Sequence, residues 1–177
     1  MKRIASKAII VSMIMVMVGL PVFAAGPDYG AAAATKAIQS GAVLTIPDML
    51  RWAVEDEYLA HGEYLAIIRK FGSQRPYSNI VLAEEQHLGW LKTEFANRSM
   101  AFPADGSSPH VIVPADLKAA AQAGVDAEIS NIAMYKAFLA RPELARPENA
   151  SVKTLFEHLM AASENHLRSF RTQLAKY

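Results

Sequence analysis

Asn79-Ile-Val-Leu-Ala-Glu84-Glu85-Gln86-His87-Leu88 carries a carboxylate and an imidazole on one face of an expected helix. Glu84 and His87 are three residues apart, so in a helix both side chains point the same way, with about 4.5 Å of rise between them. The rest of that face is apolar and comprises Tyr77, Ile80, Val81, Leu88, Leu91 and Phe95. Because an unpartnered buried carboxylate is costly, Glu84 is expected to have a bound cation, a proton or several hydrogen bonds.

The first 24 residues have the pattern of a secretory signal peptide. Lys2, Arg3 and Lys7 precede an apolar run over residues 8–23, and Val22-Phe23-Ala24 offers small residues for cleavage. An uncleaved membrane anchor is the weaker alternative, because the run is short for a span and Pro21 interrupts its end. We therefore expect an exported protein, periplasmic or secreted, with no stable membrane span after cleavage.

Composition excludes several classes of site. The chain has no cysteine, which rules out disulfides, thiolate metal ligands and lipid attachment through cysteine. Its formal net charge is +1, and loss of the basic signal segment leaves a mildly acidic chain without charge clusters. Such a surface gives no reason to expect nucleic acid as a partner. The oligomeric state stays open, a homodimer included.

The remaining chain predicts an all-α fold. Residues 25–44 are rich in glycine and alanine and are expected to form a flexible arm, with a short helix at 31–39 as an option. One domain follows over residues 45–177. Thr45, Pro47 and Asp48 are typical of a helix start. Helices are expected at 45–70, 77–97, 115–140 and 151–176, as an up-down four-helix bundle with a long crossover over 98–114.

Two of these helices repeat a pattern of acidic and aromatic residues. Glu57 and Tyr64 are seven residues apart on an apolar stripe, as are Glu128 and Tyr135. The helix after each pair carries an inward histidine, His87 and then His166. The repeat indicates two related helical hairpins about a pseudo-twofold axis.

Three further acidic residues of the first helix point away from its stripe and are expected to be solvated: Glu55, Asp56 and Glu63.

These motifs resemble the ferritin-like superfamily, rubrerythrin relatives included. The resemblance rests on Glu57-x-x-Ala60-x-x-x-Tyr64, Ala83-Glu84-x-x-His87 and Glu128-x6-Tyr135. A closer similarity, to an uncharacterised ferritin-like family, rests on Phe71-Gly72, Tyr77-Ser-Asn79-Ile80, Gly124-Val-Asp-Ala-Glu128-Ile and Ala162-Ser163-Glu-Asn165-His166-Leu167-x-x-Phe170. The resemblance covers residues 45–175. It implies a ferritin-like four-helix bundle and, in the well-studied relatives, a carboxylate-bridged pair of iron or manganese ions.

The expected metal ligands are Glu57, Glu84, His87, Glu128 and His166. The relatives have a second Glu-x-x-His, where this chain has Ser163 in place of the glutamate. Around the ligands we expect His61 as an extra ligand or a partner of Glu57, Asn131 bonded to Glu128, and Tyr64 and Tyr135 bonded to carboxylates. Oxygen and nitrogen ligands suit iron, manganese or zinc, bound as one ion or two.

Two functions fit this pattern. The first is an exported metal-binding protein, a dinuclear iron or manganese oxidase or a peroxide-handling protein. In it, Glu84 and Glu128 bridge or chelate, Glu57 is terminal, and dioxygen or peroxide binds near Ser163. The alternative is a non-catalytic bundle that lost the redox chemistry and serves as a binding or assembly module in the cell envelope. The sequence leaves open whether the protein is an enzyme.

Overall fold

The structure is a computed structural model that describes residues 29–177, and every regular element in that range is helical. The all-α prediction is therefore confirmed for this range. The signal peptide expected at residues 1–24 lies outside the described residues, as do residues 25–28 of the expected arm. Within residues 29–177, each helix is too short or too polar to cross a membrane.

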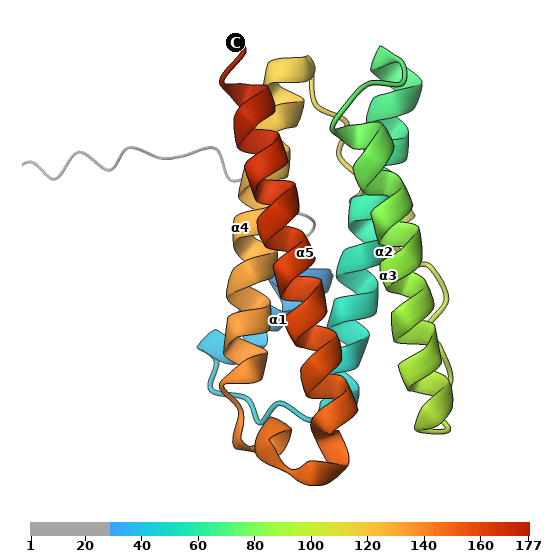
Figure 1. Cartoon of the computed structure of the whole chain (residues 1–177), viewed down its shortest axis with the longest axis vertical. Helices are drawn as coiled ribbons and strands as arrows, with labels where there is room; N and C mark the ends of the chain where they lie inside the picture. The colour runs from blue at the N-terminus through green and yellow to red at the C-terminus, as the bar shows by residue number, and fades with distance from the viewer. Residues whose placement is uncertain (1–28) are drawn as a thin grey trace, which may run out of the picture.

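Four long helices lie side by side along one axis (Figure 1). They are α2 (Ile46–Phe71), α3 (Tyr77–Asn97), α4 (Leu117–Leu139) and α5 (Ala150–Leu174), close to the bounds expected from the sequence. α2 and α3 form one antiparallel hairpin and α4 and α5 a second. Two short 3₁₀ helices, η2 (Pro142–Ala145) and η3 (Pro147–Asn149), join α4 to α5.

The start of α2 is fixed by the side chains that the sequence indicated. Thr45 Oγ1 accepts a hydrogen bond from the backbone N–H of Asp48 at 3.2 Å, and Asp48 Oδ2 accepts one from the backbone N–H of Thr45 at 3.4 Å. This reciprocal pair is a capping box, which satisfies N–H groups that have no partner within the helix. The cap sets where α2 begins and therefore where Glu57 lies along it.

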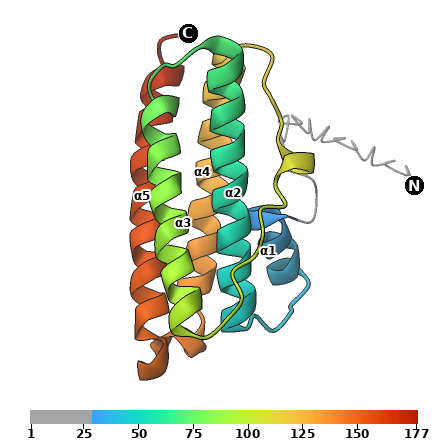
Figure 2. The same cartoon turned by 90° about the vertical axis from the view of Figure 1, so that its right-hand side faces the viewer.

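The crossover between α3 and α4 runs along α2 (Figure 2). Tyr58 donates a hydrogen bond to the carbonyl of Pro103 at 3.3 Å, and Lys70 donates one to the carbonyl of Pro114 at 2.6 Å. Between them, Glu63 accepts a hydrogen bond from the N–H of Ile112 at 3.4 Å. The expectation that Glu63 is solvated is wrong, because the crossover covers this side chain. Its burial raises the pKa of the carboxyl to about 7.

The N-terminal helix α1 (Gly30–Gln39) packs against α2 and α4, with Ala34 fully buried. Glu55 accepts a hydrogen bond from the N–H of Gly30 at 3.2 Å, and Asp56 accepts one from the N–H of Ala31 at 2.9 Å. Both carboxylates were expected to be solvated, but they satisfy the free N–H groups and the positive dipole end of α1. The short helix that the sequence left open at residues 31–39 is therefore present, and it is docked on α2 and α4.

Apolar side chains form two clusters along the bundle. One lies toward the η2 end and includes Tyr135, Phe138 and Phe156. The other lies toward the opposite end and includes Tyr64, Tyr77 and Phe170. The buried polar residues Glu57, Glu84, His87, Glu128 and His166 lie between the two clusters. This band of charge is shielded from water at both ends.

Gly124→Ala is expected to destabilise the protein by about 1–3 kcal/mol. Gly124 lies in α4 where that helix meets α5, and a Cβ there would be 2.6 Å from Cδ1 of the fully buried Phe170. The overpacking outweighs the gain of up to about 1 kcal/mol from replacing a helical glycine.

Chemical denaturation measures this effect, and Gly89→Ala is the matched control. Gly89 is also helical, but its Cβ would meet nothing within 4 Å, so that variant is expected to be slightly stabilised. Equal stabilisation in both variants would contradict the close packing of α4 on Phe170.

Candidate metal centre

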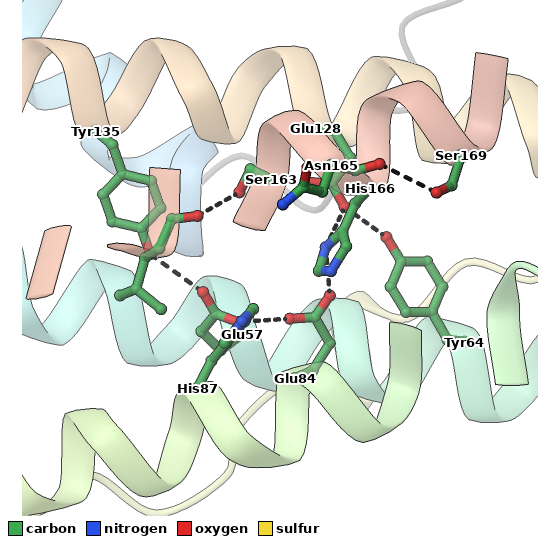
Figure 3. Close-up of polar contacts among 11 residues, drawn as sticks. Glu57, Tyr64, Glu84, His87, Glu128, Tyr135, Ser163, Asn165, His166 and Ser169 are labelled. Carbon is green, nitrogen blue, oxygen red and sulfur yellow. Dashed lines mark hydrogen bonds and ion pairs between the residues drawn. The ribbon is translucent and has the colours of Figure 1, made fainter. Parts of the chain in front are cut away.

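Each of the four long helices contributes at least one side chain to a buried acidic and imidazole cluster (Figure 3). α2 supplies Glu57, α3 supplies Glu84 and His87, α4 supplies Glu128, and α5 supplies His166. All five residues are at most 8% exposed. The cluster forms because each residue lies on the apolar stripe of its helix, so packing the stripes brings the polar groups together.

The cluster consists of two triads that share Glu84. In the first, Nδ1 of His87 lies 3.0 Å from Oε2 of Glu57 and 2.8 Å from Oε2 of Glu84. In the second, Nδ1 of His166 lies 3.3 Å from Oε1 of Glu84 and 3.4 Å from Oε1 of Glu128. Within each triad, the three candidate ligand atoms lie within 4.8 Å of one another. Each carboxylate oxygen of Glu84 thus faces a different triad.

Two tyrosines each donate a hydrogen bond to a carboxylate of the opposite hairpin. Tyr64 of α2 donates a hydrogen bond to Oε1 of Glu128 on α4, and Tyr135 of α4 donates one to Oε1 of Glu57 on α2, both at 3.2 Å. Burial raises the pKa of both phenols well above 10, and the nearby carboxylates raise it further. Both hydroxyls therefore remain hydrogen-bond donors. The expected bonds between the tyrosines and carboxylates are confirmed, and their matched geometry fits a pseudo-twofold axis through the cluster.

The charges of the cluster are strongly interdependent. Burial alone would lower the pKa of the imidazoles, but their carboxylate partners raise it to about 10 for His87 and about 9 for His166. Burial alone would raise the pKa of Glu84, but hydrogen bonds from both imidazoles lower it to about 2. Burial raises the pKa of Glu57 well above its ordinary value and also raises that of Glu128.

The donor set suits divalent cations. Each triad offers one imidazole nitrogen, one carboxylate of its own and one oxygen of Glu84, a combination that iron, manganese and zinc accept. Oε2 of Glu128 is also buried and has no hydrogen-bond partner in the part of the chain that the structure describes. Such an oxygen is costly unless a donor or a cation meets it. These residues could therefore hold two ions, with Glu84 between them.

The structure narrows one expected role near the cluster and corrects another. Glu84 and Glu128 were expected to bridge or chelate. Glu84 belongs to both triads, whereas Glu128 belongs to one, in which its Oε1 lies 3.4 Å from Nδ1 of His166 and accepts the hydrogen bond from Tyr64. His61 was expected beside Glu57. Its Nε2 instead lies 3.2 Å from Oε1 of Glu85, outside both triads. One turn along α2 from Glu57, His61 lies at the edge of the buried stripe, where α2 faces the exposed side of α3.

Asn131 and Ser163 are buried but differ in their contacts. Asn131 was expected to bond to Glu128, yet no hydrogen bond joins these two residues. Oδ1 of Asn131 and Oε2 of Glu128 are both buried without a partner among the described residues. The expected bond is therefore wrong. Ser163 is 3% exposed, and its hydroxyl donates to the carbonyl of Leu159 on its own helix at 3.2 Å. The two triads contain no residue that takes the place of a fourth carboxylate.

Sequence reasoning missed Trp90, which lies beside the cluster. Its indole ring centre is 5.3 Å from that of His87 and 6.4 Å from that of His158 on α5, and the residue is 38% exposed. Trp90 also lines a groove of about 490 Å³ between α3 and α5. Its position three residues after His87 was the available signal, because such residues are neighbours on a helix.

Comparisons with protein-family models, with curated proteins and with solved structures found no match for this chain.

Proposed function

We propose that the protein is an exported, ferritin-like metalloprotein that holds two divalent iron or manganese ions and uses them to reduce hydrogen peroxide or dioxygen. One observation carries the proposal: two buried triads, each with two carboxylates and an imidazole, share Glu84. A carboxylate that faces two ligand sets is suited to hold two cations close together. The apolar N-terminal segment supports export, and the resemblance of the motifs supports the ferritin-like assignment.

The bound ions would supply electrons through one-electron changes between their divalent and trivalent states. Reduction of one hydrogen peroxide molecule to two water molecules takes two electrons and two protons, and two such ions together provide the electrons. In a single turnover, one peroxide is consumed for each pair of ions, with the protons taken from solvent. No further reductant is needed for that turnover.

The chain's own residues hold and protect this chemistry. Tyr64 and Tyr135 orient Glu128 and Glu57 by hydrogen bonds at 3.2 Å. The two apolar clusters exclude water from both ends of the charged band, which strengthens the interaction of the carboxylates with cations. His87 and His166 must lose their protons to bind cations, so metal binding and proton release are coupled.

The mature protein is expected to bind two equivalents of iron(II) or manganese(II). The test is elemental analysis of protein purified without chelators, before and after anaerobic incubation with each metal. A single-turnover assay then measures peroxide consumed per pair of oxidised ions. About two equivalents and one peroxide per pair support the proposal, whereas failure to bind either metal contradicts it.

A second candidate function is a non-catalytic binding or assembly module in the cell envelope. Hydrogen bonds within the cluster favour it, because protonated His87 and His166 each lie between two carboxylates. Protonated imidazoles on both sides of Glu84 stabilise the cluster without a metal. This candidate predicts that the thermal midpoint is the same with and without added metal, whereas the metalloprotein gains stability from each bound ion.

A further inference from the structure

The pseudo-twofold arrangement assigns Ser163 a particular place in the cluster. Glu57 corresponds to Glu128, and His87 to His166, whose rings lie 5.7 Å apart at an angle of 27°. Glu84 precedes His87 by three residues, and Ser163 precedes His166 by three residues. Ser163, labelled in Figure 3, is therefore the counterpart of the shared carboxylate. It is 3% exposed.

The ligand set is unbalanced on the side of Ser163. Two divalent cations bring four positive charges, whereas Glu57, Glu84 and Glu128 supply three negative ones, which leaves one uncompensated charge in a buried site. A buried net charge is costly. The counterpart of Glu84 would remove it, but a serine hydroxyl carries no charge. A monovalent anion would restore neutrality and add oxygen donors.

Size and chemistry indicate which anion fits. Beyond Cβ, a glutamate carries one methylene carbon and a carboxylate group, whereas a serine carries only its hydroxyl. Formate next to the serine hydroxyl therefore takes up about the same space as the missing side chain. The Ser163 hydroxyl now donates to the carbonyl of Leu159 at 3.2 Å, and rotation about its Cα–Cβ bond can direct it to an anion instead.

We propose that a small carboxylate anion from solution, of the size of formate, completes the metal site in place of a fourth glutamate and is held by the Ser163 hydroxyl. This inference rests on the proposed metal site. The anion takes the place expected for dioxygen or peroxide near Ser163, so it would compete with those molecules. Small carboxylates would then stabilise the loaded protein and slow its chemistry.

The test measures the affinity for manganese(II) at constant ionic strength, with formate replacing chloride. Formate is expected to raise the affinity of the wild-type protein about tenfold or more, since it adds a charge-assisted interaction. Ser163→Glu is expected to bind manganese tightly without formate and to lose the formate effect. Ser163→Ala is expected to weaken the formate effect, because it removes the hydroxyl that holds the anion. In loaded wild-type protein, the ¹³C resonance of labelled formate is expected to broaden, and in Ser163→Glu it is not.

Ser169→Glu is the matched control, because Ser169 is an exposed serine of α5 that bonds to the carbonyl of Asn165 as Ser163 bonds to Leu159. It is expected to keep the formate effect. Binding of two manganese ions that formate does not affect would overturn this inference and leave the metal site in place. Failure to bind manganese in either anion would overturn the metal site itself.

Discussion

Replacing Glu84 with glutamine is expected to remove both metal ions at once, whereas Glu57→Gln and Glu128→Gln are each expected to remove one. The reason is the geometry of the triads, because Glu84 belongs to both and each other carboxylate belongs to one. Glutamine keeps the shape of the side chain but loses the charged oxygen that binds cations. Elemental analysis of the three variants after anaerobic loading measures the loss directly.

The same variant is expected to lose about 3–5 kcal/mol of unfolding free energy in the metal-free state, as when one partner of a buried ion pair is removed. Glu84 pairs with Nδ1 of His87 at 2.8 Å and with Nδ1 of His166 at 3.3 Å. Urea denaturation measures this loss, and circular dichroism checks that the helices persist.

Glu85→Gln is the control for these measurements. The Glu85 side chain is 56% exposed and, within residues 29–177, pairs only with His61, so neither metal content nor stability should change appreciably. Retention of two equivalents by Glu84→Gln would contradict the shared role of Glu84. Loss of both ions from all three acidic variants would show that the two sites are filled only together.

The helices could be predicted because each has a long apolar stripe and clear end signals. Thr45 and Asp48 cap α2 as expected, and α3 begins at Tyr77, where the sequence placed the start of the next helix. Docking of α1 could not be predicted in this way. It depends on Glu55 and Asp56 of α2 meeting backbone N–H groups far away in the chain, and helical periodicity carries no information on such contacts.

The cluster could be predicted in part for the same physical reason. A carboxylate in an apolar stripe must be buried with partners, and this located Glu57, Glu84 and Glu128. Which group each one meets depends on how the hairpins pack. The crosswise bonds of Tyr64 and Tyr135 follow from that packing, as does the position of His61 at the edge of its stripe.

Raising the pH from 7 to 9 is expected to tighten manganese(II) binding by about tenfold per pH unit for each ion. The pKa of His87 is about 10 and that of His166 about 9, so both imidazoles carry a proton at pH 7 that must leave before the nitrogen binds a cation. Titrations with manganese(II) across this range measure the slope. His158→Gln is the control, because His158 is exposed on α5 and belongs to neither triad.

The metal-free protein is expected to respond to pH in the opposite sense. A pKa that is raised on folding stabilises the protein fully below the unfolded value of 6.5 and loses that contribution as the pH rises through the folded value. The unfolding midpoint of metal-free protein should therefore fall between pH 7 and 10, while added manganese restores more stability at higher pH. Manganese affinity that stays constant from pH 7 to 9 would mean that the imidazoles are not the ligands. An unfolding midpoint that does not fall over this pH range would mean that the two imidazoles are not positively charged in the folded, metal-free protein.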